Sequence, residues 1–230
     1  MVKKRQGQVA QRFLIYFSGL LIMALGIVLL IKADLGATPW DVFHVGLYQQ
    51  FGLTIGSWSV IVGIVILSVA AVISKEFPQF GAFLNMILVG VFIDMYLMIP
   101  FLSTPQGIAG KILMFSLGVV LMGYGIGLYI SASFGTGPRD SLMMALTTKM
   151  NWKIRNVRGG MELGVLLVGW QLGGPISWGT FVFTFIIGPV VGFAMPQCFQ
   201  FADAFLDKMD HKKSLIMPLN GEDSNRGADL

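Results

Sequence analysis

The chain has 230 residues, of which 55% are hydrophobic and only 12% are charged, and its mean hydropathy is +0.74. Soluble domains carry about 25% charged residues, so this chain has too little polar surface for a soluble fold. Its apolar runs approach the length of about 20 residues that a membrane-spanning helix requires. The composition therefore predicts an all-α integral membrane protein and leaves no room for a separate soluble domain.

The first apolar run, residues 13–33, follows a basic N-terminal segment, residues 1–12, as in a secretory signal peptide. A signal core has about 7–15 residues and ends at a small-x-small cleavage site, whereas this run is longer and lacks a convincing site. We therefore expect residues 13–33 to be retained as the first membrane span.

Five more apolar segments follow along the chain. The six candidate spans are residues 13–33, 57–74, 82–102, 111–132, 157–172 and 178–199. The fifth is the weakest, because it is short and contains Glu162 and Gln171.

Basic residues orient these spans, because Lys and Arg are retained on the cytoplasmic side during insertion. With the N-terminus inside, 14 of the 16 Lys and Arg residues fall in the cytoplasm, and only Lys32 and Lys111 fall outside. This asymmetry predicts a plasma-membrane protein with both termini in the cytoplasm, where residues 200–230 form a polar tail with a disordered end. The basic pI follows from the topology, so no nucleic-acid partner is implied.

An internal repeat is the most informative feature of the sequence. Residues 36–41 (GATPWD) match residues 135–140 (GTGPRD) at an offset of 99, and residues 81–90 match residues 179–188 at an offset of 98. Each half, 13–102 and 111–199, then holds three spans. Because three is odd, consecutive units enter the membrane with opposite polarity. We therefore expect a six-span helical bundle built from two inverted three-span repeats, an architecture typical of secondary transporters.

The repeated motif predicts where one helix ends and another begins. In the first copy, Gly36 permits a tight break, Thr38 can cap the next helix, Pro39 fits its first position, and Asp41 resembles the acidic member of a capping box. The second copy has Gly at both the break and the cap, followed by proline and an acidic residue; its members are Gly135, Gly137, Pro138 and Asp140.

Each motif should start a short helix, at residues 39–50 and 138–149. Such a helix is only about 15 Å long at 1.5 Å per residue, half of the roughly 30 Å hydrocarbon core. It can lie flat at the interface or enter the membrane as a re-entrant half-helix, and the sequence leaves both alternatives open. If both helices enter, their ends would approach one another and could bind a polar solute or an ion.

Four acidic residues are candidates for substrate or ion binding. Asp41 and Asp140 either bind a solute, a cation or a proton, or simply cap their helices. Asp94, within the third span, and Glu162, within the fifth, are ionisable groups that should face the bundle interior. Asp94 alternatively makes a structural hydrogen bond, and Glu162 alternatively pairs with Arg158 one turn away.

Catalytic and metal-binding motifs are lacking in the sequence. No Walker loop, HExxH, CxxC or nucleophile elbow occurs, and His44 and His211 have no ligand partner at a useful spacing. We therefore expect no cofactor, no metal site and no enzymatic activity.

The doubled motif, in ADLGATPWD (residues 33–41) and SFGTGPRD (residues 133–140), resembles the bacterial YczE/YitT-type multi-pass membrane proteins. The resemblance covers about residues 10–200 and implies a bacterial plasma-membrane location. It implies no substrate and no catalytic residues. The short polar C-terminus is similar to that of the shorter YczE-type form.

The leading functional prediction is a small transporter or permease for an unidentified solute. The alternative is a non-transporting accessory protein that supports another complex; an intramembrane enzyme ranks third. The expected partners are the lipid bilayer and an unknown small solute. GxxxG pairs at residues 123/127, 160/164 and 188/192 favour close helix packing within the chain and leave a homo-oligomer open.

Overall fold

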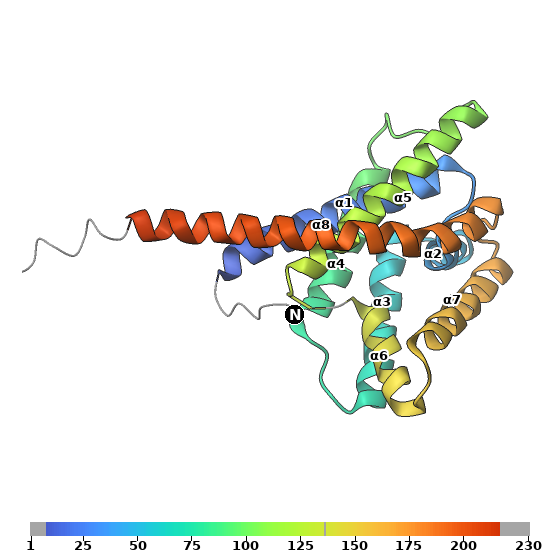
Figure 1. The fold of residues 1–230 in the computed structure, drawn as a ribbon. Helices are drawn as coiled ribbons and strands as arrows, with labels where there is room; N and C mark the ends of the chain where they lie inside the picture. The colour runs from blue at the N-terminus through green and yellow to red at the C-terminus, as the bar shows by residue number, and fades with distance from the viewer. Residues whose placement is uncertain (1–7, 136, 217–230) are drawn as a thin grey trace, which may run out of the picture.

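The computed structural model describes residues 8–135 and 137–216, which form eight α-helices joined by short connections (Figure 1). The helices are α1 (Val9–Ala33), α2 (Pro39–Phe51), α3 (Ile55–Ser74), α4 (Phe80–Leu97), α5 (Ile108–Ser131), α6 (Pro138–Met150), α7 (Ile154–Gln171) and α8 (Trp178–Ile216). The predicted all-helical fold is confirmed. Every predicted span and both predicted short helices correspond to one of these helices.

Local sequence accounts for most helix ends. Pro39 and Pro138 occupy the first turns of α2 and α6, where proline's missing N–H costs nothing. The helix α4 ends at Leu97, five residues earlier than predicted, because Pro100 disfavours helical backbone in the residue before it. The helix α8 continues to Ile216, so residues 200–216, predicted as part of the polar tail, are helical. The predicted disordered end, residues 217–230, lies outside the described residues.

Five of the described helices are long and apolar enough to cross a membrane: α1, α3, α4, α5 and α8. The fifth predicted span, at α7, is not confirmed by this criterion, so the predicted total of six is not confirmed. The reason is its charge, since Arg155, Arg158 and Glu162 all fall within its 18 residues. Large apolar side chains are widely exposed on the outer faces of the bundle, as expected where helices meet lipid; examples are Val72, Phe185 and Phe193.

The centre of the fold is the crossing of α1 and α5 (Figure 1). Gly19 lies against the backbone of Gly125, and Gly26 lies against the backbone of Gly118. Contacts therefore move backwards along α5 as they move forwards along α1, which makes the two helices antiparallel. A Cβ atom added at Gly26 would lie 2.6 Å from the Met122 nitrogen, so only glycine permits this approach.

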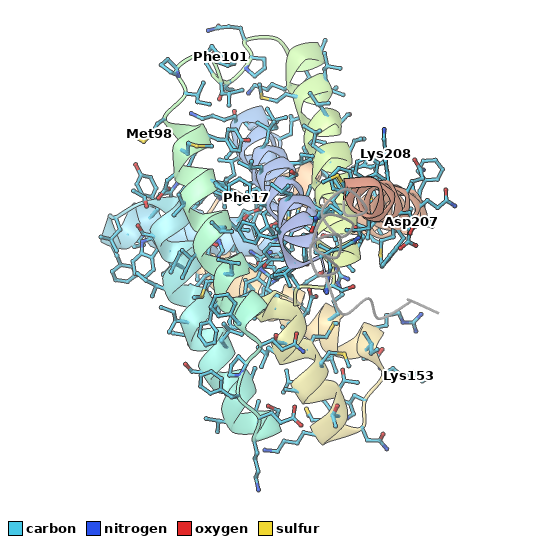
Figure 2. All side chains as sticks on the ribbon, turned by 90° about the vertical axis from the view of Figure 1, so that its left-hand side faces the viewer. Phe17, Met98, Phe101, Lys153, Asp207 and Lys208 are labelled. Atoms are coloured by element: carbon cyan, nitrogen blue, oxygen red, sulfur yellow. The ribbon has the colours of Figure 1, made fainter. Side chains whose placement is uncertain are left out.

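The other helices pack around this pair. The helix α4 packs on α1, and α8 packs on α5; α2 packs on α7, and α6 on α3. Figure 2 shows Phe17 near the centre of the molecule, where its ring meets that of Phe92 at 5.1 Å. Of the three GxxxG pairs, only Gly123 and Gly127 face another helix, α8. The members of the other two pairs face open space: Gly160, Gly164, Gly188 and Gly192.

The helix boundaries recur along the chain with a fixed spacing. The helices α1, α2 and α3 begin at residues 9, 39 and 55, and α5, α6 and α7 begin at residues 108, 138 and 154, which is 99 residues later in each case. The helix α8 begins 98 residues after α4, at 178 against 80. The two offsets are those of the sequence repeat.

The glycine crossing generates the first prediction. Replacing Gly26 with alanine forces a methyl group into the α5 backbone, and overpacking of this kind costs about 1–3 kcal/mol. Gly26→Ala should therefore lower the unfolding temperature of the detergent-solubilised protein by several degrees. The matched control is Gly192→Ala, which places the same methyl group where no atom lies within 4 Å. Equal unfolding temperatures for the two variants would contradict the assigned crossing.

Candidate functional site

A cavity of about 340 Å³ lies between the two halves of the chain, and residues from all eight described helices line it. This volume is within the range of small-molecule sites. Most of the lining is apolar, and six methionines contribute to it: Met23, Met86, Met122, Met143, Met161 and Met195. The start of α2 and the start of α6 both reach the cavity, so both copies of the repeated motif contribute to one site.

The first copy forms a closed hydrogen-bonded cap at the start of α2. The Thr38 hydroxyl accepts a hydrogen bond from the backbone N–H of Asp41 at 3.1 Å and donates one to the Asp41 carboxylate at 2.6 Å. Thr38 is the predicted N-cap, and this prediction is confirmed. In a standard capping box the acidic side chain accepts a hydrogen bond from the backbone N–H of the cap residue. Here the Asp41 carboxylate accepts one from the Thr38 hydroxyl instead.

Asp41 itself is almost completely buried, with 1% of its surface exposed, and it does not line the cavity. Its second carboxylate oxygen, Oδ1, has no hydrogen-bond partner and lies 3.8 Å from Nδ1 of His44. His44 is equally buried, and it does line the cavity. A polar pair thus lies directly behind the cavity wall, linked to the first motif.

The second copy leaves its helix start without a side-chain cap, because Gly137 occupies the N-cap position. Asp140 lines the cavity and accepts a hydrogen bond from the Tyr129 hydroxyl at 3.3 Å. Arg139 is half-buried, and its guanidinium lies over the Trp40 ring at 4.7 Å from the ring centre. This cation–π contact joins the two motifs directly, since Trp40 and Arg139 follow the proline of each copy.

The helix breaks before each motif are held by the other half of the chain. Gly36 and Gly135 have positive φ angles of 117° and 144°, which non-glycine residues rarely adopt. The N–H of Gly179, at the start of α8, donates to the Leu35 carbonyl at 2.8 Å, beside the first break. At the second break, Gly81 of α4 lies directly against the Phe134 carbonyl. Each break is thus packed against the start of the last helix of the opposite half.

The other two predicted acidic residues occupy different places. Asp94 lies outside the cavity lining, where its carboxylate accepts hydrogen bonds from the Thr54 hydroxyl at 2.5 Å and from the Gly56 N–H at 2.8 Å. It therefore ties α4 to the start of α3. Glu162 lines the cavity and pairs with Arg158 at 3.0 Å, so the predicted ion pair is confirmed.

Sequence reasoning missed Arg139 and Trp40 as site residues. The sequence does contain an indication of their role, because each lies between the proline and the aspartate of its copy of the motif. Because one is tryptophan and the other is arginine, the match between these two positions did not indicate a contact. Asn85 lines the cavity beside them and is 6% exposed, with its Nδ2 atom lacking a hydrogen-bond partner. Among the described residues, no three His, Cys, Asp or Glu side chains lie close enough together to hold a metal ion.

The helices and their exposed apolar faces define a multi-pass α-helical membrane protein. Residues 10–196 match a protein family described as "Family of unknown function (DUF6198)", and the chain belongs to this family. It is similar to "Uncharacterized membrane protein YczE" of Bacillus subtilis (strain 168), with 48% identity over 191 residues covering 82% of this chain and 87% of that protein. The resemblance to YczE-type proteins is thereby confirmed.

Two further relatives are more distant. An "Uncharacterized protein" of Haemophilus influenzae (strain ATCC 51907 / DSM 11121 / KW20 / Rd) is 31% identical over 75% of this chain and 78% of its own length. "Uncharacterized protein YyaS" of Bacillus subtilis (strain 168) is 29% identical over 80% of this chain and 92% of its own length. No solved structure matches the chain.

The cap on α2 generates the second prediction. Thr38→Ala removes an N-cap hydrogen bond, a loss of about 1 kcal/mol, and leaves the buried Asp41 carboxylate without its donor. The unfolding temperature measured by tryptophan fluorescence should fall clearly. Thr38→Ser keeps the hydroxyl and should remain close to the unmodified protein. If alanine and serine behave alike, the hydroxyl does not hold the motif.

Proposed function

We propose that this protein is a small permease that carries a solute through the cavity between two inverted three-span repeats. In this proposal α7 also crosses the membrane, which makes six crossings with α1, α3, α4, α5 and α8; both termini are cytoplasmic, and the membrane is the bacterial plasma membrane. The protein binds and releases its solute without chemical conversion, and Arg139, Asp140, Glu162 and Asn85 supply the polar groups of the cavity.

The observation that carries the proposal is the contact between Arg139 and Trp40. These residues occupy the same position in the two copies of the motif, 99 residues apart. Two equivalent positions that touch one another lie on or near a pseudo-twofold axis. A cavity on such an axis, lined by the starts of two short helices, is the arrangement in which transporters of inverted repeats bind their substrates.

The α1–α5 crossing supports the inverted relationship. Adding 99 to Gly19 and Gly26 gives Gly118 and Gly125. The contact of Gly19 with Gly125 therefore becomes the contact of Gly26 with Gly118 when the halves are exchanged. The two equivalent helices are antiparallel, and exchanging the halves converts one glycine contact into the other. Both properties are expected of two units that have opposite polarity in the membrane.

The helix α2 also favours the re-entrant alternative over the interfacial one. Eight of its thirteen residues are buried, and Gly46 lies against the backbone of Gly169 in α7. A helix lying flat at the membrane surface would expose one side along its whole length. Protein surrounds residues 39–47 of α2, including the helix start, which is the condition under which a helix end is tolerated at membrane depth.

The assignment of α7 as a crossing rests on its equivalence to α3. Both helices begin at the same repeat position, and each packs on the short helix of the opposite half. Its charges have partners or reach the surface, since Glu162 pairs with Arg158 and 58% of the Arg158 side chain is exposed. Figure 2 has Lys153 at the opposite end of the molecule from Met98 and Phe101, in keeping with a cytoplasmic start of α7 and an external α4–α5 connection.

An asymmetry between the halves suggests the access route. The backbones of α3 and α4 touch where Gly56 meets Gly90. At the equivalent positions stand Arg155 and Gly188, and Gly188 has no neighbouring atom within 4 Å. Both α7 and α8 line the cavity, and the exposed Arg158 lies at its edge. The cavity therefore opens beside α7, on the proposed cytoplasmic side, and rocking of one repeat against the other would open it to the outside.

Cysteine labelling tests this orientation without knowledge of the solute. Met161 of α7 and Val62 of α3 both line the cavity and occupy equivalent positions, 99 residues apart. In a Cys198→Ala background, Met161→Cys should react with a membrane-impermeant maleimide in inside-out vesicles and much more slowly in right-side-out vesicles. Val62→Cys, the matched position, lines the same cavity and should show the same sidedness. Labelling of Met161→Cys only from the outside would contradict the proposed topology.

Uptake into proteoliposomes tests transport itself. Purified protein should accumulate at least one solute from a panel of organic acids, amino acids, sugars and monovalent cations, and Asp140→Asn should change the rate because this carboxylate faces the cavity. Asp94→Asn is the matched control outside the cavity and should leave transport unaltered in the protein that remains folded. Absence of any flux, together with co-purification of a stoichiometric partner, would favour an accessory protein instead.

A further inference from the structure

The charged side chains in the cavity are unequally paired. Four of them line it: Arg139, Asp140, Arg158 and Glu162. Arg158 and Glu162 neutralise one another at 3.0 Å. Asp140 accepts a hydrogen bond from Tyr129. Within the described residues, Arg139 forms its cation–π contact with Trp40 and no salt bridge within 4 Å, so the donors of its guanidinium remain available to a ligand.

A second group of donors lies beside Arg139. The first N–H groups of any α-helix have no partner within the helix, and at α6 the N-cap residue, Gly137, has no side chain to cap them. The Asn85 side chain packs against this residue, since a Cβ atom at Gly137 would lie 3.2 Å from Asn85 Oδ1. Asn85 lines the same cavity; its Nδ2 atom is buried and forms no hydrogen bond of good geometry, and its side chain also approaches the Tyr16 hydroxyl. Arg139, Asn85 and the start of α6 thus all line one cavity.

The rest of the cavity suits an apolar group. Its wall carries six methionines together with isoleucine, valine and phenylalanine side chains. Methionine is flexible and polarisable, and it adapts to apolar ligands of irregular shape. An inorganic anion would fill the polar end only and leave this surface unused. Arg139 forms no salt bridge with a described residue, so its end of the cavity favours an anion over a cation.

We propose that the cavity binds a small organic monoanion, a carboxylate on an apolar body, with the carboxylate held by Arg139, Asn85 and the start of α6. The apolar body lies among the methionines. Trp40 fixes the plane of the guanidinium, so that two of its donors can face the two carboxylate oxygens together. Asp140 repels the same anion, and its hydrogen bond to Tyr129 weakens this repulsion. The assignment deepens the proposed transport function and rests on it for its physiological role.

Binding to the purified full-length protein in detergent tests this inference. The probes are hexanoate and phenylacetate, each compared with its neutral amide, hexanamide or phenylacetamide, and with inorganic phosphate. We expect the carboxylates to bind at least about tenfold more tightly than the amides, as charge-assisted hydrogen bonds predict. Calorimetry and quenching of tryptophan fluorescence provide two independent readouts. Equal affinity for acid and amide, or preferential binding of phosphate, would overturn the proposal.

Two substitutions with opposite expected effects complete the test. Arg139→Gln should remove the preference for carboxylate over amide, whereas Asp140→Asn should tighten carboxylate binding several-fold because it removes the repelling charge. Arg139→Lys should retain only part of the preference, since lysine lacks the planar fork. Partitioning into detergent affects all variants equally and cannot produce this pattern. If Arg139→Gln does not fold, Asp140→Asn decides alone, and unchanged or weaker binding by that variant overturns the proposal.

The outcome is separable from that of the transport experiment. Carboxylate binding that follows this pattern in a protein without flux would support the site and contradict the permease. Flux of another class of solute, without carboxylate binding, would support the permease and overturn the assignment of an anion.

Discussion

The close crossing of α1 and α5 is the contact on which the rest of this structure depends. In a bilayer, apolar side chains gain little by leaving lipid for another helix, so helices associate where their backbones approach closely. Gly19, Gly26, Gly118 and Gly125 provide that approach at two levels of the crossing. The remaining helices are arranged around it, α4 against α1 and α8 against α5. Because the crossing pairs equivalent glycines of the two halves, it also aligns the two copies of the motif opposite one another.

A second constraint explains why the motif copies meet inside the protein. Unpaired backbone groups are costly in hydrocarbon, so a helix can begin at membrane depth only where protein or water covers its end. The glycine breaks before α2 and α6 are covered by the starts of α8 and α4, and the helix starts themselves face the cavity. At the start of α2, the Thr38 hydroxyl accepts a hydrogen bond from the backbone N–H of Asp41. The second, at Gly137, has no side-chain cap, and the polar atoms nearest to it belong to Asn85. The two starts therefore differ in their capacity to receive a ligand, although their backbones are alike.

The halves have also diverged where α7 and α8 meet. Glycine at positions 56 and 63 lets α3 approach α4 closely, whereas the equivalent positions of α7 carry Arg155 and Glu162. These larger charged side chains prevent a similar approach to α8. The close packing of α3 on α4, without an equivalent packing of α7 on α8 among the described helix pairs, thus accompanies these differences at two matching positions. The same substitutions give α7 the charge that separates it from the five strongly apolar helices.

The sequence by itself determined where the helices lie and most of their starts, because apolar runs, prolines and glycines act locally; it misplaced the ends of α4 and α8. It predicted the breaks before residues 39 and 138, the cap at Thr38 and the pairing of Arg158 with Glu162. The repeat also indicated that two short helices belong together. Only the tertiary structure decided which polar residues share a site, since that depends on segments about a hundred residues apart. It placed Asp94 at the start of α3, enclosed Asp41 behind the cavity wall, and brought Arg139 onto Trp40. Local spacing cannot reveal such a contact, because the close approach of α1 and α5 creates it.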